Sequence, residues 1–230
     1  MTQYSFIFIL CRHLPGNPVC GAKFIVHPSM PKLYMLLVGA TPPGRHTEQH
    51  DVFFGIADSI RDLLPQVVDF WPEAKKGLHL DAWREVTLVN GYAISVTDDS
   101  THNSPKQLFF INLGGYKRGE FEEFHYKMIV AAPDKGEAIK ASKQTAFFRH
   151  TGFKGANAHI DDKYGVDVDD IYAIRDILPA AVKEKYSLHL APAPPGAAED
   201  EIHLGYFKLD TVDKWAPKEV EPKDVKEDEK

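Results

Sequence analysis

Two stretches of this chain match each other at a fixed spacing. A shift of 75 positions places Leu33, Gly39, Gly44, Glu48, His50 and Ala57 on Leu108, Gly114, Gly119, Glu123, His125 and Ala132. After a five-residue insertion the identity resumes at a spacing of 80, which pairs His79, Asp81, Val86, Tyr92, Ala93 and Ile94 with His159, Asp161, Val166, Tyr172, Ala173 and Ile174. Spaced identity of this kind indicates an internal repeat and therefore a fold built from two similar units.

The length of the chain is consistent with this duplication. Its 230 residues accommodate two copies of roughly 65 residues and a C-terminal extension. A unit this short buries little apolar surface alone, so we expect the copies to pack face to face as one pseudo-twofold body. The predicted divisions are an N-terminal extension (1–29), copy one (30–100), copy two (101–175), a C-terminal helix and hairpin packed on copy two (176–210), and a disordered charged tail (211–230).

The hydrophobic pattern of copy one predicts the order ββαββ. Apolar runs at 33–38 and 51–57 are typical of strands, and a helix is expected from Ser59, as N-cap, to Trp71 because apolar residues recur there at helical spacing. Residues 78–86 and 92–96 are predicted strands joined near Asn90-Gly91, a strong hairpin signal.

Copy two is predicted to repeat this order. Strands are expected at 107–113, 127–132 and 158–162, with a helix at 135–149. A further helix at 174–186 and strands at 187–191 and 201–209, joined as a hairpin, complete the body, with His189 and His203 as a cross-strand pair. The predicted fold class is α+β.

The N-terminal segment stands outside the duplication. Its apolar stretch at 4–11 is far too short to span a bilayer and has no preceding Lys or Arg, as a signal peptide would have. Met30 immediately precedes the first repeat strand. Met30 or Met1 is the native start, and residues 1–29 are accordingly an extension upstream of the true start or a poorly ordered N-terminal segment.

Composition excludes several classes of protein. The net charge of −6 and pI near 6.0 disfavour nucleic-acid binding, which relies on clustered Lys and Arg. Cys11 and Cys20 are the only cysteines and lie outside the repeats, which excludes a disulfide framework or a Cys-rich zinc site in the core. We expect a cytoplasmic protein that contacts no membrane.

Each copy contains the motif Gly-x4-Gly-x3-Glu-x-His just before its second strand. Side chains alternate along a strand, so Glu48 and His50 project to one side, as His79 and Asp81 do in a later strand. If these two strands are neighbours, each copy assembles two imidazoles and two carboxylates. The equivalents in copy two are Glu123, His125, His159 and Asp161.

Three interpretations of this group remain open. It is a binding or catalytic site in which a carboxylate orients a working histidine, a metal site, or a structural network of mutually satisfied polar groups. Copy one alone adds Arg45 and His46, and Arg45 is a fixed cation suited to a carboxylate or phosphate ligand. The glycines indicate a turn with positive φ or a close backbone approach. The overall prediction includes no metal and no cofactor.

Familiar catalytic motifs are absent from the sequence. There is no phosphate-binding P-loop, nucleophile elbow, His-Glu-x-x-His zinc motif or dinucleotide fingerprint. The sequence therefore supports neither the common hydrolase and metalloprotease classes nor nucleotide binding.

The segment from Leu33 to Gly39, the run from Gly44 to Phe54, and His79-Leu80-Asp81 resemble an uncharacterised bacterial family, domain of unknown function 1543. The resemblance covers residues 30–96 strongly and 107–175 more weakly. The family domain is similar in length to one copy and occurs singly or in pairs, which implies the repeated fold unit and a bacterial cytosolic setting. It implies no reaction.

These observations lead to one leading functional hypothesis and two alternatives. We expect a binding or regulatory module that recognises a small anionic ligand or a protein partner near Arg45, His46, Glu48, His50, His79 and Asp81. The first alternative is an enzyme with a Glu/Asp–His acid/base pair. The second is a structural protein that self-associates, as a homodimer for example, through exposed strand edges.

Overall fold

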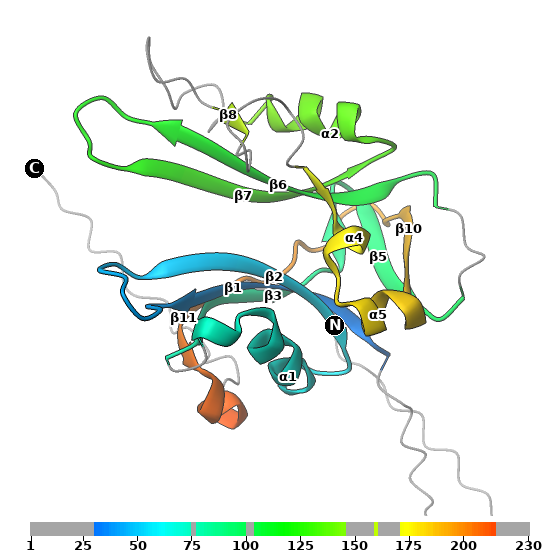
Figure 1. Cartoon of the computed structure of the whole chain (residues 1–230). Helices are drawn as coiled ribbons and strands as arrows, with labels where there is room; N and C mark the ends of the chain where they lie inside the picture. The colour runs from blue at the N-terminus through cyan, green and yellow to red at the C-terminus, as the bar shows by residue number, and fades with distance from the viewer. Residues whose placement is uncertain (1–29, 75–76, 100–103, 146–158, 161–170, 215–230) are drawn as a thin grey trace, which may run out of the picture.

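Two β-sheets face each other, and each carries a helix on its outer side (Figure 1). The structure, a computed structural model, describes residues 30–74, 77–99, 104–145, 159–160 and 171–214. The predicted N-terminal extension and residues 215–230 lie outside the described ranges. The α+β prediction is confirmed.

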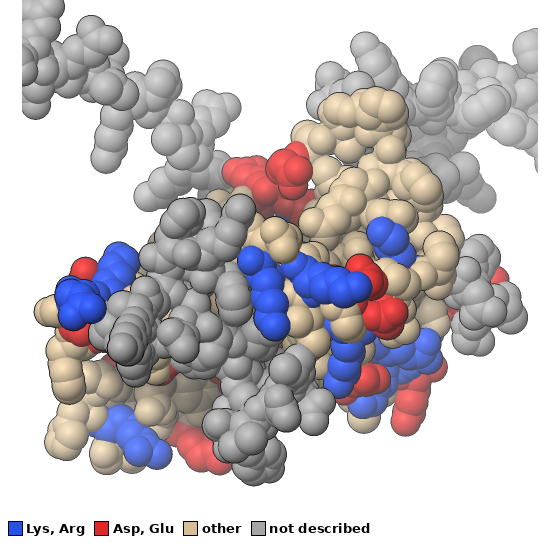
Figure 2. All heavy atoms as spheres, turned by 90° about the horizontal axis from the view of Figure 1, so that it is seen from above, with Lys and Arg blue, Asp and Glu red and all other residues tan. Residues whose placement is uncertain are grey.

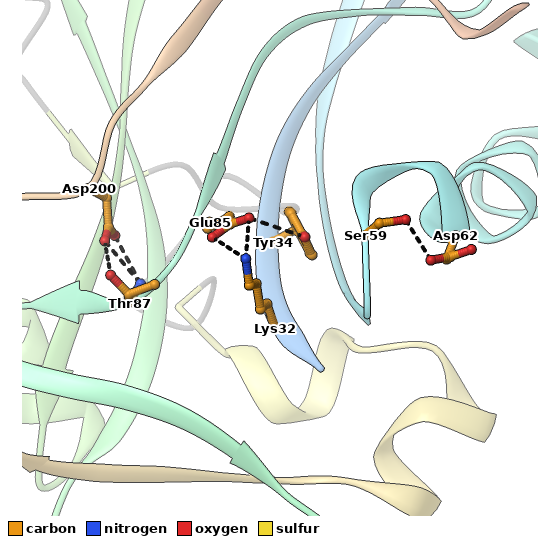
Figure 3. Close-up of polar contacts among 7 residues, drawn as sticks. All are labelled: Lys32, Tyr34, Ser59, Asp62, Glu85, Thr87 and Asp200. Atoms are coloured by element: carbon orange, nitrogen blue, oxygen red, sulfur yellow. Dashed lines mark hydrogen bonds and ion pairs between the residues drawn. The ribbon is translucent and has the colours of Figure 1, made fainter. Parts of the chain in front are cut away.

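The first sheet, sheet A, has the strand order β11-β3-β1-β2, and all its pairs are antiparallel. Its members are β1 (Lys32–Ala40), β2 (Gln49–Ala57), β3 (His79–Glu85) and β11 (His203–Lys208). Helix α1 (Ile60–Phe70) follows β2 and covers the outer face, with Leu63 and Val67 fully buried. Ser59 precedes this helix as predicted, but its hydroxyl bonds to Asp62 and not to the helix backbone (Figure 3).

The second large sheet, sheet C, has the order β7-β6-β8, with β9 also paired to β6. Its members are β6 (Gln107–Tyr116), β7 (Glu123–Ala132), β8 (His159–Ile160) and β9 (Tyr172–Ala173). Helix α2 (Lys135–Ser142) covers its outer face. This helix ends earlier than predicted, and residues 146–149 of the predicted span are outside the described ranges.

The two large sheets use the same strand register. In sheet A, Gly39 of β1 lies opposite His50 on one side and His79 on the other. In sheet C, Gly114 of β6 lies opposite His125 and His159 in the same way. The units diverge further along: β9 pairs with β6, whereas the corresponding residues of copy one leave sheet A and join a separate sheet.

That smaller sheet, sheet B, has the order β10-β5-β4. It consists of β4 (Leu88–Val89), β5 (Tyr92–Thr97) and β10 (Ser187–Pro192). The predicted Asn90-Gly91 turn joins β4 to β5, and both residues have positive φ, as a tight two-residue hairpin turn requires. The last strand of the predicted ββαββ unit therefore pairs outside the sheet that contains the first three.

The C-terminal predictions need two corrections. The single helix expected at 174–186 is two short helices, α4 (Ile174–Ile177) and α5 (Ala180–Lys185), because Pro179 holds Leu178 in extended backbone. The expected hairpin is wrong: β10 pairs with β5 and β11 pairs with β3, so both strands join partners from copy one rather than each other. His189 lies opposite Ser95, and His203 lies opposite Trp83.

The predicted tail begins too early. Residues 211–214 belong to the 3₁₀ helix η2 (Leu209–Lys214), and Leu209 and Val212 pack against the core between sheet A and α1. A second 3₁₀ helix, η1 (Pro72–Ala74), follows α1 and buries Ala74 in the same core. None of the helices in the described part of the chain is long and apolar enough to cross a bilayer.

Polar contacts fix β3 to its surroundings at its C-terminal end. Glu85 accepts hydrogen bonds from Lys32 and from the Tyr34 hydroxyl, while Asp200 accepts from the backbone and hydroxyl of Thr87 (Figure 3). Burial, followed by the negative charge of Glu85, raises the pKa of Tyr34 above its ordinary value. Asp200 thus ties the segment before β11 to the β3–β4 junction.

One apolar layer is shared by both sheets. Alternate residues of β1 face it, beginning with Leu33, and Leu108 and Phe110 of β6 enter it from the opposite side. Phe54 and Phe110 meet edge to face across the layer, with ring centroids 5.4 Å apart. Burial of each large apolar side chain contributes about 1.5–3 kcal/mol, so this layer holds the two sheets together.

We predict measurable energetic coupling between the sheets. The single variants Phe54→Leu and Phe110→Leu and the double variant should reveal an interaction energy of about 0.5–1.5 kcal/mol in denaturant unfolding, because the edge-to-face contact needs both rings. Phe109 faces α2 on the other side of sheet C. Phe54→Leu combined with Phe109→Leu should therefore be additive, and equal additivity in both cycles would contradict the shared layer.

Candidate functional site

Four of the six predicted site residues of copy one, Glu48, His50, His79 and Asp81, meet around Gly39. This glycine lies on the central strand β1, directly opposite His50 of β2 and His79 of β3. Cross-strand neighbours project from the same face of a sheet. The two imidazoles therefore lie on either side of Gly39, which has no side chain. The sequence-based prediction assumed that the two strands holding the histidines are neighbours. In the structure they lie on opposite sides of β1.

A bulge in β3 supplies the aspartate. The register shifts between Leu37 and Val38, which lie opposite Ala82 and Leu80, so that Asp81 is the extra residue. A bulge of this kind sets two residues against one on the partner strand, and Asp81 keeps the face of His79 that the period-two spacing predicts. Asp81 thereby reaches the space above Gly39.

Glu48, His50, His79 and Asp81 form one group, called here the His–carboxylate cluster. His79 Nε2 is 3.0 Å from Glu48 Oε1 and 3.4 Å from Asp81 Oδ1. His50 Nε2 is 3.1 Å from Asp81 Oδ2 and 3.7 Å from Glu48 Oε2. Carboxylates and imidazoles therefore alternate around the cluster, and copy one brings together the two imidazoles and two carboxylates that the sequence spacing suggested.

His79 is the fixed member of the cluster. Its side chain is 3% exposed, its Nδ1 lies 2.8 Å from the Gly77 carbonyl oxygen, and its ring contacts the Tyr206 ring at 4.1 Å between centroids. A carbonyl oxygen only accepts hydrogen bonds, so Nδ1 carries a proton and donates it. In the neutral ring Nε2 then has a lone pair, and this lone pair is directed into the cluster.

The other three side chains are partly accessible. Side-chain exposure is 44% for Glu48, 38% for His50 and 26% for Asp81. Despite the short distances, His79 Nε2 and Asp81 Oδ2 are buried atoms without a hydrogen-bond partner in the described structure. The cluster is therefore close-packed but not satisfied internally, which disfavours a purely structural network.

Gly39 is required for space and not for its backbone conformation. A Cβ atom at this position would lie 2.4 Å from Asp81 Oδ2 and 2.6 Å from His79 Nε2. The second glycine of the motif has the other function foreseen from the sequence, because Gly44 has φ +80° in the loop before β2. The two glycines of the motif thus have different roles: Gly39 leaves space for the cluster, and Gly44 allows a turn with positive φ.

Arg45 and His46 lie in the same loop as Glu48 but are not drawn into the cluster. Both side chains are exposed, and the described structure shows no polar contact between either of them and the four cluster residues. They stay candidates for contact with a ligand that extends from the cluster. The structure does not test that prediction.

The equivalent site of copy two is only partly described. Glu123 accepts a hydrogen bond from the Tyr116 hydroxyl, and His125 is exposed on β7. The backbone of His159 pairs with Gly114, while its side-chain position and Asp161 lie outside the described residues. Whether copy two assembles the same group stays a prediction.

Two aromatic neighbours were missed by the sequence analysis. Tyr206 of β11 contacts the ring of His79, and His203 stacks on Trp83 at 3.8 Å between centroids. Both contacts depend on the pairing of β11 with β3, which no local pattern in the sequence encodes. The contact between His79 and the Gly77 carbonyl, two residues earlier in the chain, was also missed.

Chemically, the cluster offers two carboxylates and two imidazole nitrogens at one face of sheet A. As the side chains stand, no group of three or more His, Cys, Asp or Glu residues in the described ranges could hold a metal ion. Charged side chains of both signs are interspersed on the face seen in Figure 2. On this face of sheet A, the His–carboxylate cluster is the group of polar side chains that lie in contact with one another.

Comparisons with known proteins support the family resemblance of this segment. A family model described as Domain of Unknown Function (DUF1543) matches residues 45–96, a span that contains all four cluster residues. Among solved structures the chain is similar to a protein Il1583 from Idiomarina loihiensis, with 24% identity over 78% of this chain and 97% of that chain and a TM-score of 0.46. That likeness carries no functional argument, and no curated protein matches the sequence.

We predict that Gly39→Ala disrupts the cluster. The added methyl group overlaps Asp81 and the fixed ring of His79, and overpacking of this kind costs about 1–3 kcal/mol in the free energy of unfolding. Histidine side-chain NMR should show both imidazole signals displaced.

The neighbouring variant Val38→Ala is the control. Val38 is fully buried on the opposite face of β1, so its truncation should cost roughly 2 kcal/mol while the imidazole signals keep their positions. Wild-type stability and unchanged imidazole signals in Gly39→Ala would show that the glycine is not a spatial requirement.

Proposed function

We propose that this protein is a binding module whose ligand site is the His–carboxylate cluster. The observation that carries the proposal is the convergence of four polar side chains over a bare glycine, with buried polar atoms that lack hydrogen-bond partners. Buried polar groups in native proteins are normally satisfied, so unsatisfied atoms at a partly accessible position favour a ligand that completes their bonding.

The charges of the cluster define what such a ligand needs. Glu48 and Asp81 present carboxylates, so the part of the ligand that enters the cluster is cationic or donates hydrogen bonds. Arg45, three residues before Glu48, is suited to an anionic group on the same ligand. A ligand with a cationic or hydrogen-bond-donating centre therefore fits this proposal better than a simple anion.

An acid/base enzyme is the second candidate. The observation that favours it is the close approach of His50 Nε2 to Asp81 (3.1 Å) and of His79 Nε2 to Glu48 (3.0 Å). A carboxylate at this distance can orient a histidine and stabilise its charged form during proton transfer. Conversion of a bound compound, rather than simple retention, distinguishes this candidate.

Self-association is the third candidate. Strand β11 forms one edge of sheet A, and Leu204 and Tyr206 on this strand are 75% and 62% exposed. Exposed apolar edge strands are sites at which another chain can pair. Sedimentation that depends on protein concentration would favour a homodimer.

We further infer that the two large sheets descend from one duplicated unit. The register of Gly39 between His50 and His79 recurs at Gly114 between His125 and His159, which agrees with the sequence spacings of 75 and 80. Gly44 and Gly119 also share positive φ. The inner faces of sheets A and C meet in the shared apolar layer, which agrees with the proposed pseudo-twofold arrangement.

The binding proposal predicts ligand-dependent stabilisation that requires Glu48 and His50. In a thermal-shift screen with cationic, anionic and zwitterionic compounds, a ligand at 100 times its Kd should raise Tm by about 5–10 °C, because it binds only the folded state. The variant Glu48→Gln/His50→Gln should lose this rise.

The matched control is Glu73→Gln, which changes an exposed carboxylate of η1 outside the proposed site. It should keep the full rise in Tm. The proposal fails if the compounds stabilise Glu48→Gln/His50→Gln as strongly as they stabilise the wild type.

A further inference from the structure

We infer that the ligand of the His–carboxylate cluster is a divalent first-row transition-metal ion, such as Zn²⁺. The inference deepens the proposed binding function and rests on it for the location of the site. It departs from the sequence-based prediction, which included no metal. His50 and His79 supply nitrogen, and Glu48 and Asp81 supply oxygen.

The first argument concerns the hydrogen bonding of His79. Its Nδ1 donates to the Gly77 carbonyl, which leaves the Nε2 lone pair directed at two carboxylates. A lone pair facing negatively charged oxygens is repelled unless a cation lies between them. A metal-ligating histidine typically donates its second ring nitrogen to a backbone carbonyl in this way.

The burial of this nitrogen strengthens the argument. The His79 side chain is 97% buried, and Nε2 has no hydrogen-bond partner in the described structure although Glu48 lies only 3.0 Å away. Asp81 Oδ2 is likewise buried and has no hydrogen-bond partner, although His50 Nε2 lies 3.1 Å away. The atoms are close but not aligned for hydrogen bonds, which fits donors that converge on a common ion.

The spacing of the donor atoms also fits an ion. Ligands at about 2.1 Å from zinc, with angles between tetrahedral and octahedral values, lie about 3.0–3.4 Å from each other. The four nitrogen–oxygen separations in the cluster are 3.0, 3.1, 3.4 and 3.7 Å. Only the contact between Glu48 and His50 exceeds this interval.

The donor set selects the type of ion. Imidazole with carboxylate suits zinc and its first-row neighbours, whereas magnesium and calcium prefer oxygen ligands alone. Two carboxylates balance the charge of a divalent ion at a position where His79 is buried. No cysteine contributes, because Cys11 and Cys20 lie in the N-terminal segment.

Ion binding requires the side chains to rearrange, since as they stand no group of three or more His, Cys, Asp or Glu residues in the described ranges could hold a metal ion. The rearrangement falls on the two most exposed members, Glu48 and His50. Glu48 precedes the first residue of β2, so the strand ladder does not fix its backbone. His79 stays in place, held by Gly77 and Tyr206.

Metal titration of the full chain tests the inference. The protein is treated with a chelator, dialysed and titrated with Co²⁺ alone, followed by Zn²⁺, with calorimetry and visible absorption as readouts and Mg²⁺ as comparison. Wild type should bind Co²⁺ with absorption bands typical of nitrogen ligation, and Zn²⁺ should displace it. Mg²⁺ should produce no comparable heat.

The variants identify the ligands. Glu48→Gln/His50→Gln should lose one equivalent of ion, or bind it at least about 100-fold more weakly, because loss of an outer-shell partner alone costs about 10- to 100-fold. Glu73→Gln, which changes an exposed carboxylate outside the site, should bind as wild type does. Thermal unfolding without metal verifies that each variant is folded, and the single variant His50→Gln replaces the double variant if that one is not.

Equal binding by wild type and by Glu48→Gln/His50→Gln would overturn the inference, and so would the absence of any saturable Co²⁺ or Zn²⁺ binding. Because the titration contains no organic compound, its failure leaves intact any small-molecule stabilisation that depends on Glu48 and His50. The two proposals therefore fail separately.

Discussion

The apolar layer between sheets A and C is the constraint on which the rest of the structure depends. Each sheet is short and has a single helix on its outer face, so neither could hide its inner face without the other. The layer begins at Leu33 on β1 and includes Phe54 and Phe110, whose rings meet across it. Because side chains alternate along β1, the same requirement that turns Leu33 inward also turns Gly39 inward, and the cluster consequently lies on the face that looks toward sheet C.

Much of this arrangement is predictable from local pattern. The strands β1 and β2 and helix α1 follow from period-two and period-3.6 spacing, and the Glu-x-His and His-x-Asp spacings correctly place their members on common faces. The prediction relied on neighbouring strands, however, whereas β1 lies between them. Sequence spacing reports the face on which a side chain projects and does not report which strands are adjacent.

Most of the features that were not predicted arise from long-range strand pairing. The partners of β10 and β11 are chosen by long-range pairing, so their sequence proximity wrongly favoured a hairpin. The break at Pro179 was readable, because a residue before proline avoids helical backbone, but the apolar spacing across it favoured a continuous helix. The bulge at Asp81 and the stacking of Tyr206 on His79 arise only once β1, β3 and β11 are in register.

The position of the cluster connects binding to the stability of sheet A. Its members come from β3, β2 and the residue before β2, so a bound ligand links both edges of β1 at a row where Gly39 contributes no side-chain contacts. That row has less apolar packing than the Leu33 end of the strand, where the shared layer is continuous. A sheet that is weakly packed at one end gains most from a ligand placed there, since binding to the folded state alone stabilises it by mass action. The glycine that makes room for the cluster thus also makes this end of the sheet dependent on what the cluster binds.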